Sequence, residues 1–288
     1  MTRSGNNKDS KRILITGAGG FVGSALFSKL KYAKPIGVDF GITEVCQESK
    51  LFNVDLRNEE AVKTLFNKYS PDIVFHFAAL TSPQRNEANI ELATEGHIKI
   101  TNNILNNLNK DTHLIFLSTD KIFDGVDPCP DEKAKVSPLW IYGKLKWECE
   151  NIIQERLKRL HIFRLGIVHS LGDCFALSKE SGPASFVDKA IIDIKAGKEV
   201  VAFDNVERCF VRLRLLVKLF EMAMDDCHYG IYHVGSAMMN YYDRVRILCE
   251  EERIKWEGKL IPRHGKALPM VQNLNTDKLK KIFCLTFN

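Results

Sequence analysis

The segment Ile15–Gly23, ITGAGGFVG, places three glycines between a short apolar stretch and an amphipathic segment. Gly17 lets the chain turn sharply out of a strand, Gly20 lets backbone approach a pyrophosphate, and Gly23 permits close packing of the following helix. Phosphates bind at such a helix N-terminus because its free N–H groups and dipole favour anions. A glycine pattern alone also suits a structural turn, but this position between strand and helix predicts dinucleotide binding. The binding residues we expect are Gly17, Gly20, Phe21, Val22 and Gly23.

Short apolar runs alternate with amphipathic segments on both sides of this turn. This alternation predicts an α/β fold of the Rossmann type, a doubly wound parallel sheet with helices on both faces. We expect strands at 12–16, 35–40, 50–56, 72–79, 112–118 and 161–168. We expect helices beginning at Phe21 and at 58–69, 92–109 and 139–160, with loops at 80–90 and 124–138.

The rhythm loosens after residue 170, which suggests a second part of the chain. We expect residues 1–10 to be disordered, 11–170 to form the dinucleotide-binding domain, and 171–288 to form mainly a small C-terminal substrate-binding lobe. Some segments of the last part are expected to return to the Rossmann sheet. Its predicted helices are 185–196, 213–224, 241–252 and 276–283, and its strands are 200–203 and 230–234.

Composition excludes several classes of protein. The 288 residues carry a formal net charge of +5 with the basic residues scattered, whereas nucleic-acid binders concentrate them in a stripe or tail. The eight cysteines include no Cys-x-x-Cys pair or zinc-site spacing, so we expect free thiols and no metal. The start lacks an apolar signal region, and the longest mostly apolar stretch, Ile73–Leu80, is far too short for a membrane span. We expect a cytoplasmic protein without nucleic-acid or membrane partners.

Two carboxylates follow predicted strands and favour NAD(H) over NADP(H). Asp39 can accept hydrogen bonds from the adenosine ribose and would repel a 2′-phosphate, and no arginine follows it immediately. It can also simply end a strand at the surface. Asp55 can approach the adenine, or it can belong to the N-cap region of the helix at 58–69. Asp55 and the next residue, Leu56, are both expected cofactor-binding residues.

Tyr142 and Lys146 stand four residues apart in a predicted helix and therefore share one face. A nearby ammonium would lower the tyrosine pKa from its reference of about 10 and could hold the nicotinamide ribose. Ser118 ends the predicted fifth strand and is an expected cofactor contact, and the hydroxyl of Thr119, the next residue, can hydrogen-bond a substrate oxygen. A Tyr-x-x-x-Lys pair alone is weak, but its place after the fifth strand predicts a site for proton and hydride transfer.

In these segments the chain resembles the extended short-chain dehydrogenases/reductases, and specifically the dTDP-4-dehydrorhamnose reductases. The resemblance spans nearly the whole chain and rests on TGAGGFVG (16–23), HFAA (76–79), STDKIFDG (118–125), SPLWIYGKLK (137–146), GIYHVG (230–235) and LNTDKLKKIF (274–283).

The resemblance implies a Rossmann domain with a small C-terminal lobe and a catalytic triad of Thr119, Tyr142 and Lys146. Tyr142 would protonate the sugar oxygen, and Thr119 would hydrogen-bond it. Ala78 and Ala79 would line the cofactor, although close packing also explains small residues there. The substrate-binding residues implied are Thr81, Thr119, Lys121 and Phe186.

Several positions depart from the family pattern and leave the sugar undetermined. Lys121 stands where the reductases usually carry an aromatic residue, and His97 where the wider family often has a relay asparagine. A helical histidine is more often a packed residue than a catalyst. The loop Thr81–Glu87 differs beside the substrate, and Phe210–Leu216 lacks the usual acidic pair.

Three functions therefore remain open. The first is NAD(P)H-dependent reduction of the 4-keto group of a nucleotide-linked deoxysugar. The second is a nucleotide-sugar epimerase or dehydratase with tightly bound NAD, which Asp120 fits in part and Lys121 does not. The third is a binding partner like the regulatory β subunit of methionine adenosyltransferase, although the triad here is complete. The family also implies a homodimer formed through helices at 92–109 and 139–160.

Overall fold

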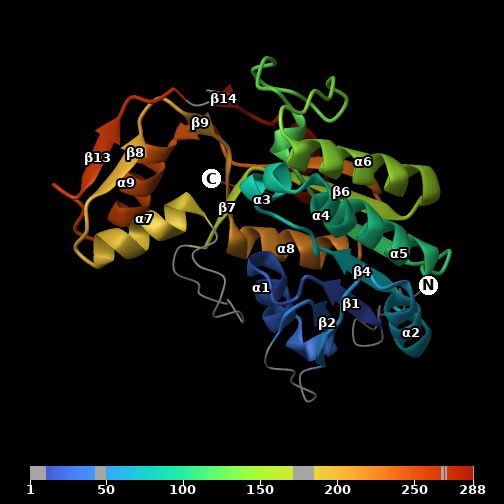
Figure 1. Ribbon diagram of the computed structural model, residues 1–288. Coiled ribbons are helices and arrows are strands. Elements are labelled where there is room, and N and C mark those ends of the chain that lie inside the picture. Colours follow the sequence, from blue (N-terminus) through green and yellow to red (C-terminus); the bar gives the residue numbers. More distant parts are fainter. Residues whose placement is uncertain (1–10, 43–49, 171–184, 267–268, 270, 288) are drawn as a thin grey trace, which may run out of the picture.

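The computed structural model describes residues 11–42, 50–170, 185–266, 269 and 271–287, so the disorder expected at 1–10 lies outside the described residues. Its centre is a parallel sheet of seven strands in the order β11-β6-β5-β4-β1-β2-β3 (Figure 1). This order confirms the predicted doubly wound Rossmann sheet. The strands are β1 (Ile13–Thr16), β2 (Ile36–Asp39), β3 (Leu51–Asn53), β4 (Ile73–His76), β5 (His113–Thr119), β6 (Leu160–Leu165) and β11 (Gly230–Val234).

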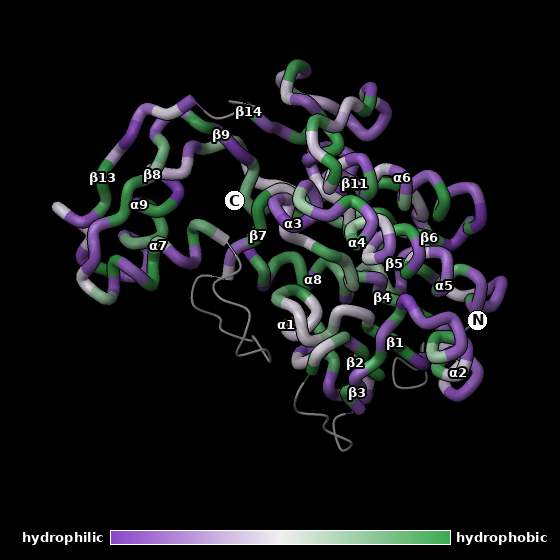
Figure 2. The backbone as a smooth tube through the Cα atoms, viewed as in Figure 1, coloured by the Kyte–Doolittle hydropathy of each residue, from purple (hydrophilic) through white to green (hydrophobic). Residues whose placement is uncertain are grey.

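Helices cover both faces of this sheet and enclose two apolar cores. One face packs against α1 (Phe21–Lys29), α8 (Leu213–Ala223) and α10 (Asp277–Phe283). The other packs against α2 (Glu59–Tyr69), α5 (Ile100–Asn106) and α6 (Ile141–Arg156). Figure 2 shows hydrophobic stretches along α8 and the central strands, and hydrophilic ones on the outer parts of α2 and α5. Strands covered on both faces account for the uniformly apolar runs in the sequence.

Helix α2 shows how local sequence sets an element's limits. The side chain of Asn58 accepts a hydrogen bond from the N–H of Ala61 and caps the helix, and two glutamates lie in its first turn. Val62, Leu65 and Phe66 are its buried residues, at helical spacing. The helix ends at Ser70, which adopts a left-handed conformation with φ of 41°.

The C-terminal lobe has a core of its own. It contains α7 (Phe186–Lys195) and α9 (Tyr241–Glu251), with β8 (Val200–Phe203) paired in parallel to β13 (Leu260–Arg263). Figure 1 shows these four elements grouped beside the larger sheet, with β7 between the two groups. Small sheets join the parts: β7 (Ile167–His169) with β10 (Phe210–Arg212), and β9 (Glu207–Arg208) with β12 (Met239–Asn240) and β14 (Val271–Gln272). Strand β11 and helices α8 and α10 follow the lobe's first segments in sequence but pack with the main sheet.

Several expected elements differ from those observed. The single strand expected at 161–168 breaks at Gly166, where a side chain would collide with the carbonyl of Cys209; its second half pairs with β10 instead. The loop expected at 80–90 contains α3 (Pro83–Ala88). The helix expected at 92–109 is α4 (Ile90–Thr94), a π-helical turn (Glu95–Lys99) and α5.

Within the described residues, no helix combines the length and apolar character needed to span a membrane. The same part of the chain holds no group of three or more His, Cys, Asp or Glu side chains arranged to bind a metal ion.

Candidate active site at the carboxyl ends of β1, β4 and β5

The glycine turn is locked to the end of β4. Gly17 adopts a φ of 70°, and a Cβ there would lie 2.8 Å from the backbone nitrogen of Ala78. The hydroxyl of Thr16 accepts hydrogen bonds at 3.1 Å from the N–H groups of Phe77 and Ala78. Only glycine suits both the backbone angle and the close approach at position 17. Ala78 packs closely against this turn, so close packing by itself accounts for a small residue at this position.

The same turn presents the N-terminus of α1. Gly20 is the N-cap and offers no side-chain hydrogen bond, so the amides of the first turn, starting at Phe21, are not capped. A Cβ on Gly23 would collide with the carbonyl oxygen of Gly17, so this glycine brings the helix onto the turn itself rather than onto the sheet. The arrangement is that of an anion-binding helix end.

Asp39 lies beside this turn, at the end of β2. Its carboxylate accepts hydrogen bonds at 2.8 Å from the N–H groups of Gly19 and Phe40. Burial raises the pKa of Asp39, and the backbone hydrogen bonds act in the opposite direction. The predicted ribose-binding carboxylate is therefore held against the turn.

The two residues expected beside the adenine have other partners. Asp55 forms a two-pronged ion pair with Arg57, whose Nε and Nη2 lie 2.9 and 2.8 Å from its two oxygens. The helix cap that Asp55 could have supplied belongs to Asn58. Leu56 is 2% exposed in the core beneath the sheet, and its carbonyl accepts a hydrogen bond from Asn103. The cofactor contacts of Asp55 and Leu56 stay predictions.

The three predicted catalytic residues come together at the end of β5. The side chain of Thr119 lies close enough to Tyr142 to influence its phenol, and the Thr119 hydroxyl donates to Oδ1 of Asp120 at 3.2 Å. Lys146 is 3% exposed, and its ammonium donates to the carbonyl of Leu117 at 2.7 Å. The same Nζ lies 4.5 Å from the ring centre of Phe116. Burial lowers the pKa of Lys146 to about 8.

The electrostatics of Tyr142 differ from expectation. Its pKa is raised, first by desolvation and then by the carboxylate of Asp120, while the hydrogen bond from Thr119 opposes the rise. The ammonium of Lys146 faces the Leu117 carbonyl, which explains why it does not lower the pKa of the phenol here. In this arrangement Tyr142 is a neutral proton donor.

Two buried oxygens at this point have no hydrogen-bond partner within the described residues: Oγ of Ser118 and Oδ2 of Asp120. Both residues are at least 95% buried, with exposures of 4% and 3%. Because buried polar groups are normally paired, these atoms mark a place for a ligand. Together with the helix end at Gly20, which no side chain caps, they fit a bound dinucleotide.

The predicted substrate residues are more dispersed. Thr81 is exposed in the loop between β4 and α3, and Lys121 is half-buried, with its N–H donating to Oγ of Thr119. Phe186 begins α7 in the lobe, 41% exposed, and its ring meets that of Tyr241 edge-on at 5.5 Å.

The lobe supplies neighbours that the sequence did not reveal. The amide of Gln272, on β14, donates to the carbonyl of Asp120 at 2.9 Å. Tyr241 is hydrogen-bonded to Arg208, and burial raises the pKa of this tyrosine. The charges of Arg208 and Asp120 both act on Tyr241, which places the three groups near one another. Neither two-residue strands nor isolated side chains leave a periodic signal, so only the fold identifies them.

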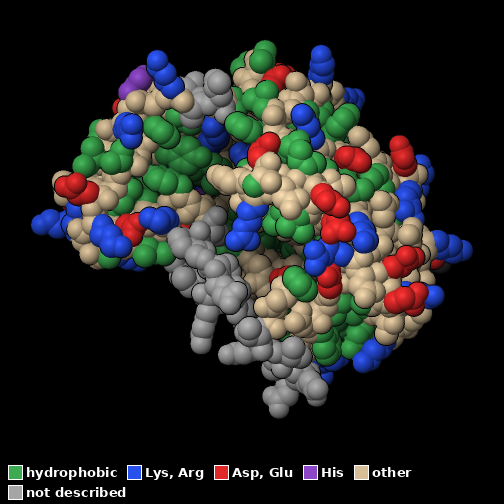
Figure 3. All heavy atoms as spheres, in the orientation of Figure 1, with side chains coloured by type: hydrophobic (Ala, Val, Ile, Leu, Met, Phe, Trp, Pro, Cys, Tyr) green, Lys and Arg blue, Asp and Glu red, His purple; other side chains and the backbone are tan. Residues whose placement is uncertain are grey.

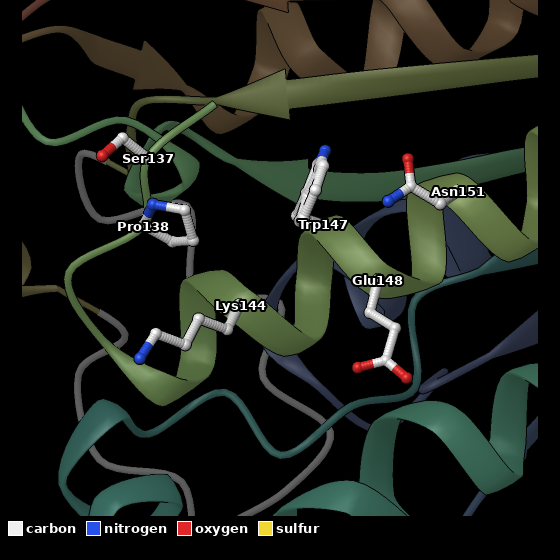
Figure 4. Close-up of a pocket in the computed structure, with 6 residues that line it drawn as sticks. All are labelled: Ser137, Pro138, Lys144, Trp147, Glu148 and Asn151. Carbon is white, nitrogen blue, oxygen red and sulfur yellow. The ribbon is translucent and has the colours of Figure 1, made fainter. Parts of the chain in front are cut away.

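A separate pocket lies on the outer side of α6, away from the buried face that carries Lys146. Among the residues that line this pocket, Trp147 and Asn151 project from the same side of α6, and Pro138 lies near the start of the helix (Figure 4). On the face drawn in Figure 3, acidic and basic side chains are interspersed, without a broad patch of one sign.

Comparison with known proteins agrees with this geometry. The family model described as RmlD substrate binding domain matches residues 11–270. Methionine adenosyltransferase 2 subunit beta of Xenopus laevis is 29% identical over 245 residues, covering 81% of this chain and 70% of that protein. Spore coat polysaccharide biosynthesis protein SpsK of Bacillus subtilis is 26% identical over 248 residues, covering 85% and 80%. The matches span 48% to 70% of the methionine adenosyltransferase subunits.

Solved structures share the fold over nearly the whole chain. The dTDP-4-dehydrorhamnose reductase of Bacillus anthracis, in complex with NADP, superposes with a TM-score of 0.81 at 20% identity, covering 96% of this chain and 93% of that one. The UDP-glucose 4-epimerase of Thermus thermophilus, in complex with NAD, gives 0.77 at 21% identity, covering 95% and 92%. The chain therefore belongs to the RmlD substrate binding domain family and has the fold of the extended short-chain dehydrogenases/reductases.

Proposed function

We propose that the protein reduces the 4-keto group of a nucleotide-linked deoxysugar with NAD(P)H. The observation that carries this proposal is that Tyr142 and Thr119 stand together at the end of β5, at the same edge of the sheet as the glycine turn. The fold is shared with reductases and epimerases of nucleotide sugars, which supports this class of substrate.

The residues divide the chemistry between them. Thr119 donates a hydrogen bond that holds the keto oxygen, and Tyr142, protonated because its pKa is raised, gives that oxygen its proton. A nicotinamide, when bound, supplies the hydride. The ammonium of Lys146 would be available to a ribose hydroxyl once it leaves the Leu117 carbonyl.

The cofactor would be held by the glycine turn, by Asp39 and by the unpaired hydroxyl of Ser118. Asp39 favours NAD(H), because its carboxylate suits ribose hydroxyls and repels a 2′-phosphate. Although no arginine directly follows Asp39 in sequence, the guanidinium carbon of Arg57 lies 5.2 Å from the ring centre of Phe40, the residue after Asp39. Because Asp55 pairs with that guanidinium, we retain NAD(H) as the proposed cofactor.

The sugar nucleotide would lie between the sheet edge and the lobe. Arg208 and Tyr241 stand near Asp120 there, and a guanidinium with a phenol suits a diphosphate. Thr81, Lys121 and Phe186 stay proposed substrate contacts on the basis of the family resemblance.

A regulatory role is the second candidate, favoured by the similarity to methionine adenosyltransferase 2 subunit beta. Such a protein needs the fold and a bound cofactor but no turnover. An epimerase or dehydratase would turn over its substrate without net loss of NADH.

One experiment separates the three. Purified protein is incubated with NADH or NADPH and a panel of nucleotide-linked 4-keto sugars that includes dTDP-4-dehydrorhamnose, and absorbance reports NADH consumption. Stoichiometric oxidation supports the reductase, and sugar conversion without oxidation supports the epimerase. No conversion of any sugar, together with a stable complex with a methionine adenosyltransferase catalytic subunit, supports the regulatory role.

We also propose that two copies associate through α6 and the adjacent helix α4. Trp147 on α6 and Trp140 at its N-cap are 39% and 43% exposed, and Ile90 and Leu92 on α4 are 55% and 41% exposed. Exposed large apolar side chains on neighbouring helices are typical of an interface. Sedimentation of the wild type and of Trp147→Glu tests this: a dimer that becomes a monomer supports it, and a monomeric wild type contradicts it.

A further inference from the structure

We propose that His97 and Asn86 form a clamp that positions residues 80–86 against the ring of Tyr142. These residues comprise the loop after β4 and the first turn of α3, and are called the substrate-side loop below. The catalytic meaning of the clamp rests on the proposed function, whereas its existence does not. Neither residue was assigned a role above, and each is a polar side chain inside the protein, at 2% and 0% exposure.

Asn86 closes the loop on itself. Its amide nitrogen donates at 2.7 Å to the carbonyl of Leu80 and at 2.7 Å to that of Ser82. Both partners are acceptors, so the nitrogen and oxygen of this amide are assigned without ambiguity. The carbonyl oxygen of Asn86 must therefore face a donor.

That donor is His97. Its Nε2 lies 3.1 Å from Oδ1 of Asn86 and 3.1 Å from the carbonyl of Leu80. Two acceptors around one ring nitrogen require the proton to be on Nε2. Burial lowers the pKa of His97 to about 3, so the ring donates this shared hydrogen bond in its neutral form.

The backbone is shaped to deliver the histidine to this point. His97 is the central residue of the π-helical turn Glu95–Lys99, which interrupts the helical run between α4 and α5. Single π turns inside helices are uncommon and cluster at functional sites.

The clamp is in contact with the proposed proton donor. The rings of His97 and Tyr142 meet edge-on, with centroids 5.7 Å apart and planes at 69°. A second link holds the same helix: the carboxylate of Glu87, next to Asn86, accepts a hydrogen bond at 2.6 Å from the N–H of Ile141. The loop and α3 are thus linked to the start of α6 at two residues, Tyr142 and Ile141.

This arrangement assigns His97 a positioning role. The loop runs from Ala79 at the cofactor edge through Thr81, the proposed substrate contact, so fixing it to Tyr142 fixes the substrate oxygen relative to the proton donor. Geometry held in this way matters because a misplacement of about 1 Å can cost on the order of 100-fold in rate.

The first test measures hydrogen exchange of the full-length protein, with no substrate required. In His97→Leu and Asn86→Leu, we expect amides in residues 80–89 to exchange about tenfold faster or more, as for the loss of one or two buried hydrogen bonds. In His97→Gln they should stay near wild type, because a glutamine amide can donate to both acceptors. The matched control is Asn103→Leu, which removes a buried amide bonded to the Leu56 carbonyl and leaves the loop alone.

The outcomes of this test are decisive. Faster exchange confined to the loop and the start of α6, with rescue by Gln, supports the clamp. Exchange that is unchanged in His97→Leu, exchange raised equally over all strands, or loop exchange raised as much by Asn103→Leu as by His97→Leu overturns it.

The second test separates the clamp from the proposed function. NADH binding is measured first, and it should be near wild type in all variants. With dTDP-4-dehydrorhamnose as probe, His97→Leu should lower kcat/KM by roughly 10- to 100-fold, and His97→Gln should restore it with an unaltered pH profile. If the wild type binds NADH but reduces no keto sugar, the proposed function fails and hydrogen exchange alone decides the clamp. If His97→Leu turns over at the wild-type rate, the positioning role is wrong.

Discussion

The ammonium group of Lys146 donates to the carbonyl oxygen of Leu117 at 2.7 Å, one helical turn beyond Tyr142. This contact pairs a buried cation with a backbone dipole. Burial nevertheless lowers the pKa of Lys146 from 10.5 to about 8. The charged form of Lys146 therefore opposes folding.

The first prediction concerns this charge. Between about pH 8 and 10.5 the unfolded chain binds the Lys146 proton and the folded chain does not, so this group makes stability rise with pH. Below pH 8 the buried charge costs about 3 kcal/mol. Lys146→Met should therefore be more stable than wild type at pH 7, by up to about that amount, and the two should converge above pH 10.5. Denaturant melts across this range check it, and a variant less stable than wild type at pH 7 would count against it.

The second prediction concerns acid stability. Six of the eight histidines are buried and have a pKa lowered by burial, to about 4 for His161 and about 3 for the others: His76, His97, His113, His169 and His233. A histidine with a lowered folded pKa binds its proton mainly when unfolded, so stability is lost as pH falls below about 6.5.

The unfolding temperature, Tm, should accordingly fall steeply as the pH is lowered from 6.5 to 5. In His161→Gln, the slope of the unfolding free energy against pH should be smaller by the equivalent of about one proton. His161 suits this test because it bridges His113 at 2.8 Å and Asp226 at 3.2 Å, far along the strands from the site. An identical slope in wild type and variant would mean that His161 is already protonated in the folded protein.

The third prediction concerns the buried ion pair between Arg164 and Glu150. Their exposures are 3% and 0%, and Nη2 of Arg164 lies 2.7 Å from the carboxylate. Glu150→Gln leaves a buried guanidinium unbalanced and should lower the free energy of unfolding by about 3–5 kcal/mol. The surface pair of Lys189 and Asp193 is the control, since Lys189→Ala should change it by less than about 1 kcal/mol. Equal effects at both sites would refute the distinction.

Much of the main sheet follows from the sequence because its strands are buried on both faces and therefore read as apolar runs. β8 and β11 fall on the predicted residues, and Ser185 and Asn240 cap α7 and α9 as their types suggest. The glycine turn was equally legible, since Gly17 and Gly23 each answer a steric demand.

What sequence reasoning missed has physical causes. The two-residue strands β9, β12 and β14 are too short for a periodic pattern. Helix α3 has the polar sequence PQRNEA and depends on its cap at Ser82 and on contacts made by Asn86. The pairing of Asp55 with Arg57 and of Lys146 with Leu117 depends on side-chain directions that residue spacing does not specify.

The fourth prediction concerns cofactor choice. Asp39→Ala removes the carboxylate that bonds Gly19 and should narrow the preference for NADH over NADPH by about tenfold, the value of one charge-assisted hydrogen bond. Fluorescence titration with both cofactors measures the ratio. Asp72→Ala is the control, because Asp72 pairs with Arg12 at the opposite end of the strands. An unchanged ratio in Asp39→Ala would remove Asp39 from the ribose.

The central claim is that Tyr142, held by Thr119 at the end of β5, donates a proton to a sugar oxygen. The most direct measurement compares wild type with Tyr142→Phe in NADH binding and in turnover of the keto sugar that the wild type accepts. We predict unchanged NADH affinity and a loss of turnover of at least about 100-fold, because the phenylalanine ring keeps the packing against His97 and lacks only the proton. Turnover close to that of the wild type would contradict the claim.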